Sequence, residues 1–591
     1  MVSLPNDEND VSSSVKSKLL SIKEYVQENW KYFVSGLIVL LLSIVLLSSN
    51  AVGYLKIALQ PVDDASICPM HEPLAPESFY QDNSTVLAIL RDEEFRLKSV
   101  KKLAGAVQIN TTVTDNQPDV PDAPQLWESF GDFHLYLQST FPKIFTLLDV
   151  DYVNTYGIVI HWKGSNSNLK PVMLTAHQDV VPVQKDTLED WSYPPFEGHY
   201  DGQYLYGRGS SDCKNILIAI LEAIELLIEQ DFKPQRGVLA VFGFDEEASG
   251  LRGAFNLSKY LEKRFGKDSI YAIVDEGSGL MKDQITGQII AMAATGEKGY
   301  ADLKIDLTTP GGHSSVPPDH TSIGLMSEVA YLMENDKYEP ILSAKNPMLK
   351  YIQCLAVNTG DKIPKMTRKA ILRAGFDKLA NSLLVKSFSK SPLTRYLIST
   401  SQSIDLVRGG EKANALPEAI TLVANHRVAI ESNIQETKDR FVSRVQIVAE
   451  KYGLGLVSFG KTILEPTAKG TFEIDFFSHA LEPAPVSPSD DTVWKYLAGV
   501  TRHVFEDLVF PDLDYPLVVA PAIMPANTDT RYYWNLTKNI YRYTPAYSED
   551  VMKENHIHSV DERVSVDAHL ETLAFFYEYV QAINTPDADN S

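Results

Sequence analysis

Cysteine is scarce in this chain, and basic side chains are outnumbered by acidic ones. Three cysteines in 591 residues cannot form the disulfide framework of a small secreted domain. Cys68 and Cys354 could pair, while Cys213 lies beside Asp212, which is assigned to metal below. With 54 Lys and Arg against 77 Asp and Glu, the formal net charge is −23. Because phosphate binding requires clustered basic side chains, this balance argues against a nucleic-acid partner.

Internal repeats and low-complexity tracts are also missing. The composition, 44% hydrophobic and 22% charged, is typical of a globular chain. A chain of 591 residues is too long for one hydrophobic core, so we expect two or more folded units.

Charge is absent from residues 32–55, a run of 24 residues rich in Leu, Val and Ile. As a helix rising about 1.5 Å per residue, this run would exceed the roughly 30 Å hydrocarbon core of a bilayer. The preceding segment, 1–31, is long for the n-region of a cleaved signal peptide. Lysines flank the run on its N-terminal side: Lys16, Lys18, Lys23 and Lys31. The positive-inside rule therefore predicts a type II membrane protein with a cytosolic tail (1–31), a signal anchor (32–55) and a lumenal body.

Sequons for N-linked glycosylation occur only after this run. They are Asn83, Asn110, Asn256 and Asn535. Each sequon alone is a weak pattern. Their distribution agrees with the predicted topology, so all four are candidate glycosylation sites.

The rest of the chain divides into four segments. Residues 56–85 are rich in Pro, Asp, Ser and Glu and are predicted to form a stalk. Residues 86–297 alternate apolar strands with helices, which predicts an α/β domain with a mixed, mostly parallel sheet. Polar–apolar alternation at the start of 298–453, followed by helical patterns, predicts an inserted α+β unit. Residues 454–591 are predicted to complete the first domain.

One predicted strand ends on an imidazole and a carboxylate. In "VMLTAHQDVVPV" an apolar run leads into His177, and Asp179 follows two positions later. Sites in open α/β sheets collect at the carboxyl ends of strands. The two-residue spacing places both side chains on one side, where a carboxylate can orient a metal-bound imidazole. His-x-Asp alone is more often structural than functional.

Three further motifs strengthen the metal hypothesis. Asp212 in "YGRGSSDCKN" precedes a long apolar helix, where it could also be a simple N-cap. "FGFDEEASG" ends a buried strand with three acids, including Glu246 and Glu247, and "AIVDEG" adds Asp275 and Glu276. Adjacent like charges repel unless cations or protons relieve them. Strand ends that deliver carboxylates and imidazole are what a two-zinc site requires.

With these motifs the chain resembles the zinc-dependent M20 metallopeptidases and aminoacylases, and within them the fungal carboxypeptidase S (Gly-X carboxypeptidase) group. The resemblance covers about residues 85–583, through "AHQDVVPV", "GRGSSDCKN", "GFDEEASG", "TPGGHSSVPPDH", "GGEKANALPE", "NTDTRYYWNLTKNIYRY" and "HSVDERV". It implies a catalytic domain with an inserted lid, a single membrane anchor and a vacuolar location. The implied activity is zinc-dependent cleavage of the C-terminal peptide bond of short peptides. The alternative is hydrolysis of N-acyl amino acids by the same machinery.

The resemblance also implies the roles of individual residues around two zinc ions. The metal ligands would be His177, the bridging Asp212, Glu247, His558 and either Asp275 or Glu276, with a slight preference for Asp275. His556 lies two positions before the ligand position and is not assigned. Glu246 would be the general base that accepts a proton from water, and Asp179 would orient His177.

Four residues match positions that hold substrate in the family. His313 would stabilise the oxyanion, and Asn414, Arg427 and Arg531 would hold the substrate, the two arginines by pairing with its carboxylate. About 100 residues separate His313 from Asn414, more than in compact relatives. The extra helices could occupy a dimerisation surface, which leaves a homodimer as a possible assembly. A receptor built on an inactive peptidase fold is a third hypothesis, which the complete set of ligands and base disfavours.

Overall fold

The computed structural model describes residues 8–48, 51–59 and 66–589. Its body is built on eight strands: β1 (Asp149–Val153), β2 (Gly157–Trp162), β3 (Val172–His177), β6 (Val238–Gly243), β7 (Ile273–Lys282), β8 (Ile289–Glu297), β17 (Val518–Met524) and β18 (Ile540–Tyr547). They form one sheet in the order β1-β2-β6-β3-β7-β18-β8-β17. The pairs β3–β6, β3–β7, β7–β18 and β8–β17 are parallel. The pairs β1–β2, β2–β6, β7–β8 and β8–β18 are antiparallel, so the sheet is mixed, as predicted, but has as many antiparallel as parallel pairs instead of being mostly parallel.

Helices cover both faces of this sheet because its strands are apolar on both sides. Val172 and Leu174 of β3 pack in the cluster that holds α9 (Lys214–Glu229) and α19 (Val566–Ala582). Met173, which points the other way, packs with α10 (Ala254–Phe265). The near-continuous apolar runs read from the sequence are therefore central strands between two helical layers.

Smaller elements complete the body. The helices are α4 (Glu77–Gln81), α5 (Ser84–Arg91), α6 (Glu93–Val107), α7 (Glu128–Thr140), α8 (Pro142–Leu147), α17 (Thr492–Arg502) and α18 (Val551–Asn555). A three-stranded sheet joins β4 (His199–Tyr200), β5 (Tyr204–Tyr206) and β19 (Arg563–Ser565). This small sheet links the segment before Asp212 to the segment after His558.

A second sheet forms the lid. Its strands are β9 (Gly299–Thr308), β11 (Ser401–Arg408), β13 (Ala419–Val428), β14 (Gly455–Ser458), β15 (Lys461–Leu464) and β16 (Thr471–Phe476), in the order β11-β13-β9-β16-β14-β15. Helices α11 (Ser322–Asn335) and α16 (Ile434–Tyr452) cover one face, and the other face is half-exposed. This sheet continues to Phe476, so the domain boundary expected at residue 453 falls within the unit.

The long helical stretch expected between residues 321 and 402 is split into separate helices. After α11 come α12 (Pro347–Asn358), α13 (Lys365–Arg373), α14 (Lys378–Phe388) and α15 (Pro392–Arg395). The side chains of α12, α13 and α14 pack with Ile290 of β8 and with Val518 and Ala520 of β17. These inserted helices therefore cover the β17 edge of the catalytic sheet rather than the lid sheet.

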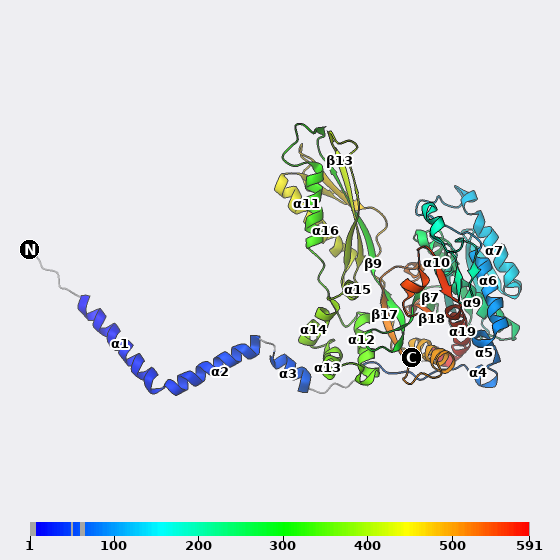
Figure 1. Cartoon of the computed structure of the whole chain (residues 1–591), viewed down its shortest axis with the longest axis horizontal. Helices are drawn as coiled ribbons and strands as arrows, with labels where there is room; N and C mark the ends of the chain where they lie inside the picture. The colour runs from blue at the N-terminus through cyan, green and yellow to red at the C-terminus, as the bar shows by residue number, and fades with distance from the viewer. Residues whose placement is uncertain (1–7, 49–50, 60–65, 590–591) are drawn as a thin grey trace, which may run out of the picture.

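The N-terminal segment forms α1 (Glu8–Glu28), α2 (Trp30–Ser48) and α3 (Ala51–Leu59). In the described part of the chain, no helix combines the length and the apolarity needed to cross a membrane. This differs from the uninterrupted helix expected over 32–55, because α2 ends at Ser48 and residues 49–50 lie outside the described part. Figure 1 shows α1 and α2 projecting from the body, with α3 next to α13 and α14.

The segment after α3 is attached to the body. Cys68 forms a disulfide with Cys354 of α12, which confirms the expected pairing, and Cys213 is a buried free thiol. The backbone N–H of Leu74 donates to the carbonyl of Gly499 at 2.9 Å. The predicted stalk is thus covalently and non-covalently docked from Cys68 onward.

Candidate metal centre

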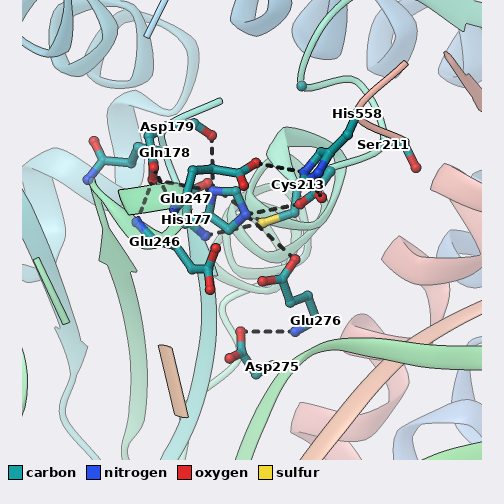
Figure 2. Close-up of polar contacts among 12 residues, drawn as sticks. His177, Gln178, Asp179, Ser211, Cys213, Glu246, Glu247, Asp275, Glu276 and His558 are labelled. Atoms are coloured by element: carbon teal, nitrogen blue, oxygen red, sulfur yellow. Dashed lines mark hydrogen bonds and ion pairs between the residues drawn. The ribbon is translucent and has the colours of Figure 1, made fainter. Parts of the chain in front are cut away.

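The candidate site lies where β3 and β6 end, beside the first half of β7, which carries Glu276. His177 is the last residue of β3 and is only 1% exposed. Its Nε2 lies 3.0 Å from Asp212 Oδ1 and 3.6 Å from Glu276 Oε2. Figure 2 shows Glu247 and His558 beside this group. The carboxyl ends of β3 and β6 therefore meet as the sequence pattern predicts, whereas Glu276 joins the group from within β7.

Asp212 lies between the two histidines. Its Oδ1 faces His177, and its Oδ2 lies 3.0 Å from Nε2 of His558. The same Nε2 lies 3.1 Å from Glu247 Oε1. The ligand atoms fall into two groups that share Asp212: one with His177 and Glu276, the other with Glu247 and His558. This is the arrangement expected for a carboxylate that bridges two metal positions.

Glu276, rather than Asp275, belongs to the first group. Consecutive strand residues point to opposite faces, so only one of the two can face His177. In Figure 2 the Glu276 side chain reaches toward His177, whereas Asp275 Oδ1 accepts a 2.9 Å hydrogen bond from the backbone N–H of Glu276. The slight preference for Asp275 stated from the sequence is corrected here in favour of Glu276.

Asp179 connects His177 to the Glu246–Glu247 turn. Its Oδ1 lies 3.3 Å from His177 Nδ1 and accepts the N–H of Glu246 at 3.1 Å. Its Oδ2 accepts the N–H of Glu247 at 3.0 Å. A single buried carboxylate therefore orients the imidazole and positions the two glutamates.

The electrostatics of the site suit cations. Burial and then Asp212 raise the pKa of Glu247 to about 7, while His558 opposes the shift. Hydrogen bonds to Asp212 and Glu247 raise the pKa of His558 to about 10. Burial and then Glu276 raise the pKa of Glu246 well above its usual range, against His177 and Arg531. Buried like charges of this kind are relieved by divalent cations, and imidazole with carboxylate oxygens is a donor set that suits zinc.

Cys213 and Glu562 belong to the site although the sequence pattern did not assign them. The Cys213 Sγ accepts the N–H of His177 at 3.2 Å and lies within the first ligand group. Burial raises the pKa of this thiol well above its usual range. Its Sγ also lies 3.7 Å from the His177 carbonyl, so the thiol packs against the backbone of a ligand residue at the edge of the first group.

Glu562 is a fully buried carboxylate beneath Asp212. Its Oε1 accepts backbone N–H groups from Gly209 at 2.9 Å and from Ser211 and Asp212 at 3.2 Å each. Its Oε2 forms an ion pair with Arg208. Glu562 follows His558 by four residues, so it joins the loop of one ligand to the turn of the bridging ligand. The only sequence signal was an extra acid in "HSVDERV".

The two candidate substrate arginines lie beside the general-base position. Arg531 Nη2 is 3.4 Å from Glu246 Oε1, and its Nε donates to the carbonyl of Thr528 at 2.9 Å. Arg427 Nη1 donates to Asn527 Oδ1 at 2.9 Å. Among the described residues, no carboxylate forms an ion pair with Arg427. Asn527 and Thr528 are consecutive, so both arginines reach the same turn. Burial lowers the pKa of Arg427, and the positive charge of Arg531 adds to that shift.

His313 and Asn414 lie elsewhere, at the far end of the lid. β9 begins at Gly299 next to the body and ends at Thr308, about 30 Å away at 3.3 Å per residue. His313 follows that end, is exposed, and contacts Ser315, with Nδ1 and Oγ 2.7 Å apart. The carbonyl of Asn414 accepts the N–H of Ser314 at 3.3 Å. These two residues are together, but apart from the metal ligands.

The four sequons differ in accessibility. Asn83, Asn110 and Asn535 are exposed. Asn256 is half-buried, and its Nδ2 donates to the carbonyls of Leu251 and Arg252 at 3.1 and 2.9 Å. The first three are therefore the sites that a glycosyltransferase would reach.

The two ligand groups that share Asp212, on a mixed α/β body joined to an α+β lid, fit the class of metal-dependent hydrolases. The model of peptidase family M20/M25/M40 matches residues 173–582. The chain belongs to this family of peptidases.

Relatives and solved structures agree with that assignment. Carboxypeptidase S of Saccharomyces cerevisiae is 42% identical over 521 residues, which are 88% of this chain and 89% of the relative. The mouse N-fatty-acyl-amino acid synthase/hydrolase is 30% identical over 499 residues, covering 83% of this chain and 89% of the relative. The crystal structure of human carnosine dipeptidase 1 aligns with a TM-score of 0.57 at 14% identity, covering 86% of this chain and 99% of that one, so it supports the fold alone.

Proposed function

We propose that this chain is a di-zinc carboxypeptidase that removes the C-terminal residue from short peptides. The single observation that carries the proposal is the guanidinium of Arg427. It is half-buried, donates to Asn527 in the turn that also binds Arg531, and forms no ion pair with a carboxylate of the described residues. A planar guanidinium pairs with a carboxylate in two parallel hydrogen bonds, so the terminal carboxylate of a peptide is a suitable ligand for it.

The two ligand groups that share Asp212 support two zinc ions. His177, Asp212 and Glu276 would hold one, and Asp212, Glu247 and His558 the other. When bound, zinc would lower the pKa of a water molecule and polarise the scissile carbonyl.

The protein groups around these ligands supply the remaining functions. Glu246 Oε accepts a proton from the attacking water and returns it to the leaving amine. Asp179 holds the backbone of Glu246 and Glu247 in place while it orients His177. Arg531 keeps a positive charge 3.4 Å from Glu246, which stabilises the carboxylate form needed for proton transfer.

The alternative substrate is an N-acyl amino acid, which also ends in a free carboxylate. The similarity to the mouse N-fatty-acyl-amino acid synthase/hydrolase favours this alternative, and the higher identity to carboxypeptidase S favours the peptide. Turnover of a blocked Gly-Leu dipeptide and of a fatty-acyl leucine by the purified protein distinguishes them. The proposal requires the peptide to have the higher kcat/KM, and a higher value for the fatty amide would reassign the chain.

We also propose that the body lies in a lumen, with the vacuole as its compartment, and is anchored by the segment 32–55. The six consecutive side chains from Leu37 to Leu42 are each 50–61% exposed, so α2 is apolar on every face and needs an apolar environment. The Cys68–Cys354 disulfide suits an oxidising compartment. Protease protection of the body in intact vesicles, together with glycans removable by endoglycosidase, is the expected result; digestion of the body would contradict it.

Finally, we propose that two copies associate and that His313 of each serves the other's site. The exposed position of His313 beyond the far end of β9 supports this hypothesis. In such an assembly Asn414, which lies beside His313, would contact the same substrate.

A further inference from the structure

The inserted helices carry a concentration of positive charge that nothing in the catalytic site uses. Residues 362–395 contain nine Lys or Arg and one Asp, in a chain whose formal net charge is −23. Five of the basic side chains are exposed lysines: Lys362, Lys365, Lys378, Lys386 and Lys390. None of the five forms an ion pair with a carboxylate of the described residues. A solvated surface in so acidic a protein would normally mix the two signs, so this segment is a candidate interaction surface.

The lysines of α14 lie along one side of the helix. Positions 378, 382 and 386 are spaced by four residues and are exposed, whereas Ala380, Leu384 and Phe388 are buried. Residues four apart share a helix face, and Lys390 continues the same spacing just beyond the helix. Phe376, two residues before Lys378, is 68% exposed. We call Phe376, Lys378, Ser382, Lys386 and Lys390 the lysine stripe.

The lysine stripe begins where the charge-free N-terminal run ends. Lys56 is the first charged residue after 32–55, and its Nζ lies 3.8 Å from Asp377 Oδ2. Ile57 of α3 is buried against Ala370 of α13 and Ala380 of α14. Figure 1 shows α3 beside α13 and α14. The end of the proposed anchor and the start of the lysine stripe are therefore at the same level.

A hydrogen bond, a disulfide and a close helix contact also attach the end of the proposed anchor to these helices. Lys369 donates a hydrogen bond to the carbonyl of Ala58, and the Cys68–Cys354 disulfide ties the following segment to α12. A Cβ on Gly53 would lie 2.5 Å from Leu379 Cδ2, so glycine allows α3 to approach α14 closely. Any bilayer that receives the anchor must lie next to α14.

We propose that the lysine stripe binds the surface of the bilayer that holds the anchor, through its anionic lipid headgroups, with Phe376 entering the interface. Basic side chains at a membrane surface are attracted by anionic headgroups, and an exposed aromatic side chain is stabilised at the headgroup level. In the proposed topology these headgroups are those of the lumenal leaflet, the one that the body faces. This inference rests on the anchoring proposed above. Its consequence is a fixed orientation: the inserted helices face the membrane, and the lid stands away from it.

The test uses the full chain in lipid nanodiscs and a fluorescent label. Cys213 is only 1% exposed and the other two cysteines are bonded, so a new surface cysteine can be labelled selectively. We would place an environment-sensitive dye at Ser382→Cys, and at Ser327→Cys on α11 as the control, since both serines are exposed. Quenching by headgroup nitroxide lipids is measured in nanodiscs of phosphatidylcholine alone and with about 30% phosphatidylserine, a content that makes the surface clearly negative.

We expect quenching at position 382 to be at least about twofold stronger in the anionic nanodiscs, and to fall in about 0.5 M salt as the Debye length shrinks. Quenching at position 327 should be absent in both. A triple variant, Lys378→Glu, Lys386→Glu and Lys390→Glu, should abolish the lipid dependence. The matched variant Lys101→Glu, Lys185→Glu and Lys461→Glu changes the net charge equally at exposed lysines elsewhere and should retain it.

Three outcomes would overturn the inference. They are equal quenching in neutral and anionic nanodiscs, no quenching at position 382, and loss of quenching when soluble glycerophosphoserine is added, which would indicate a site for free anions. Recovery of the chain with nanodiscs is measured separately. A chain that does not co-purify with them refutes the proposed anchor, whereas a chain that does, without quenching at position 382, refutes only the lysine stripe.

Discussion

The strand ends of the body and the far end of the lid both carry histidines, but their surroundings differ. His177 is 1% exposed and contacts two carboxylates of the site besides Asp179. His313 is exposed, and its ring contacts only its neighbour Ser315 among the described residues. The first arrangement is preorganised, since each side chain is held by several others. The second is free to meet another surface. The comparison teaches that the proposed metal ligands and general base are held within one body, whereas the proposed substrate-binding residues are divided between the body and the lid.

The largest effect is expected from Glu246→Gln. The amide cannot accept a proton from water, so kcat should fall by about 10³-fold, within the range of general-base catalysis. Metal content should be unchanged, because Glu246 lies outside both ligand groups. Steady-state kinetics and metal analysis check the two parts. Activity within tenfold of the unmodified protein would contradict the assignment of the base.

Arg427→Ala tests the proposed substrate contact on lid strand β13, near the end of the strand that pairs with the start of β9. Loss of a charged hydrogen-bonding partner should cost about 2 kcal/mol, or roughly 30-fold in kcat/KM, for a peptide with a free carboxylate. The corresponding C-terminal amide, a poor substrate from the start, should lose much less. Equal losses on acid and amide would assign Arg427 a structural role.

Glu562→Gln tests how rigidly the body holds its ligands. One carboxylate oxygen accepts three backbone N–H groups around Asp212. Weakening this support should lower the metal affinity by about tenfold, as is typical when a partner behind a ligand is changed. Chelator competition measures the affinity. Asp567→Asn, which alters an exposed ion pair with Arg96, is the control and should have no effect.

The smallest expected effect is a partial recovery of activity, which tests whether lid residues are exchanged between copies. Glu246→Gln and His313→Ala chains should each be nearly inactive alone. If His313 acts in the partner's site, an equal mixture should regain about one quarter of the activity, because half of the dimers are mixed and each has one complete site. A mixture that stays inactive while dimers are present would show that His313 acts within its own chain.

Much of the body was predictable because its determinants are local. The apolar run before His177, the Asp179 spacing and the three acids after β6 each indicate a strand end. The features that could not be predicted depend on contacts between distant residues or on the direction in which a single side chain points. Asp275 and Glu276 were not separated, because their difference is which way each faces in β7. The support of Asp212 by Glu562 joins residues 350 positions apart.

The lid region was less predictable for a related reason. Helical periodicity over 321–402 shows that helices form, but not that α12, α13 and α14 pack on β17 rather than on the lid sheet. The extension of that sheet to Phe476 depends on β16 pairing with β9, far earlier in the chain. Neither pairing has a local pattern in the sequence.

The central claim is that Asp212 joins two metal positions in the body. The most direct measurement is zinc content combined with X-ray absorption at the zinc edge on the purified full chain. We predict two zinc ions per chain at a separation of about 3.5–4 Å, the spacing of catalytic two-metal sites. One zinc ion or none in a fully active chain, or two ions with no zinc–zinc vector, would contradict it.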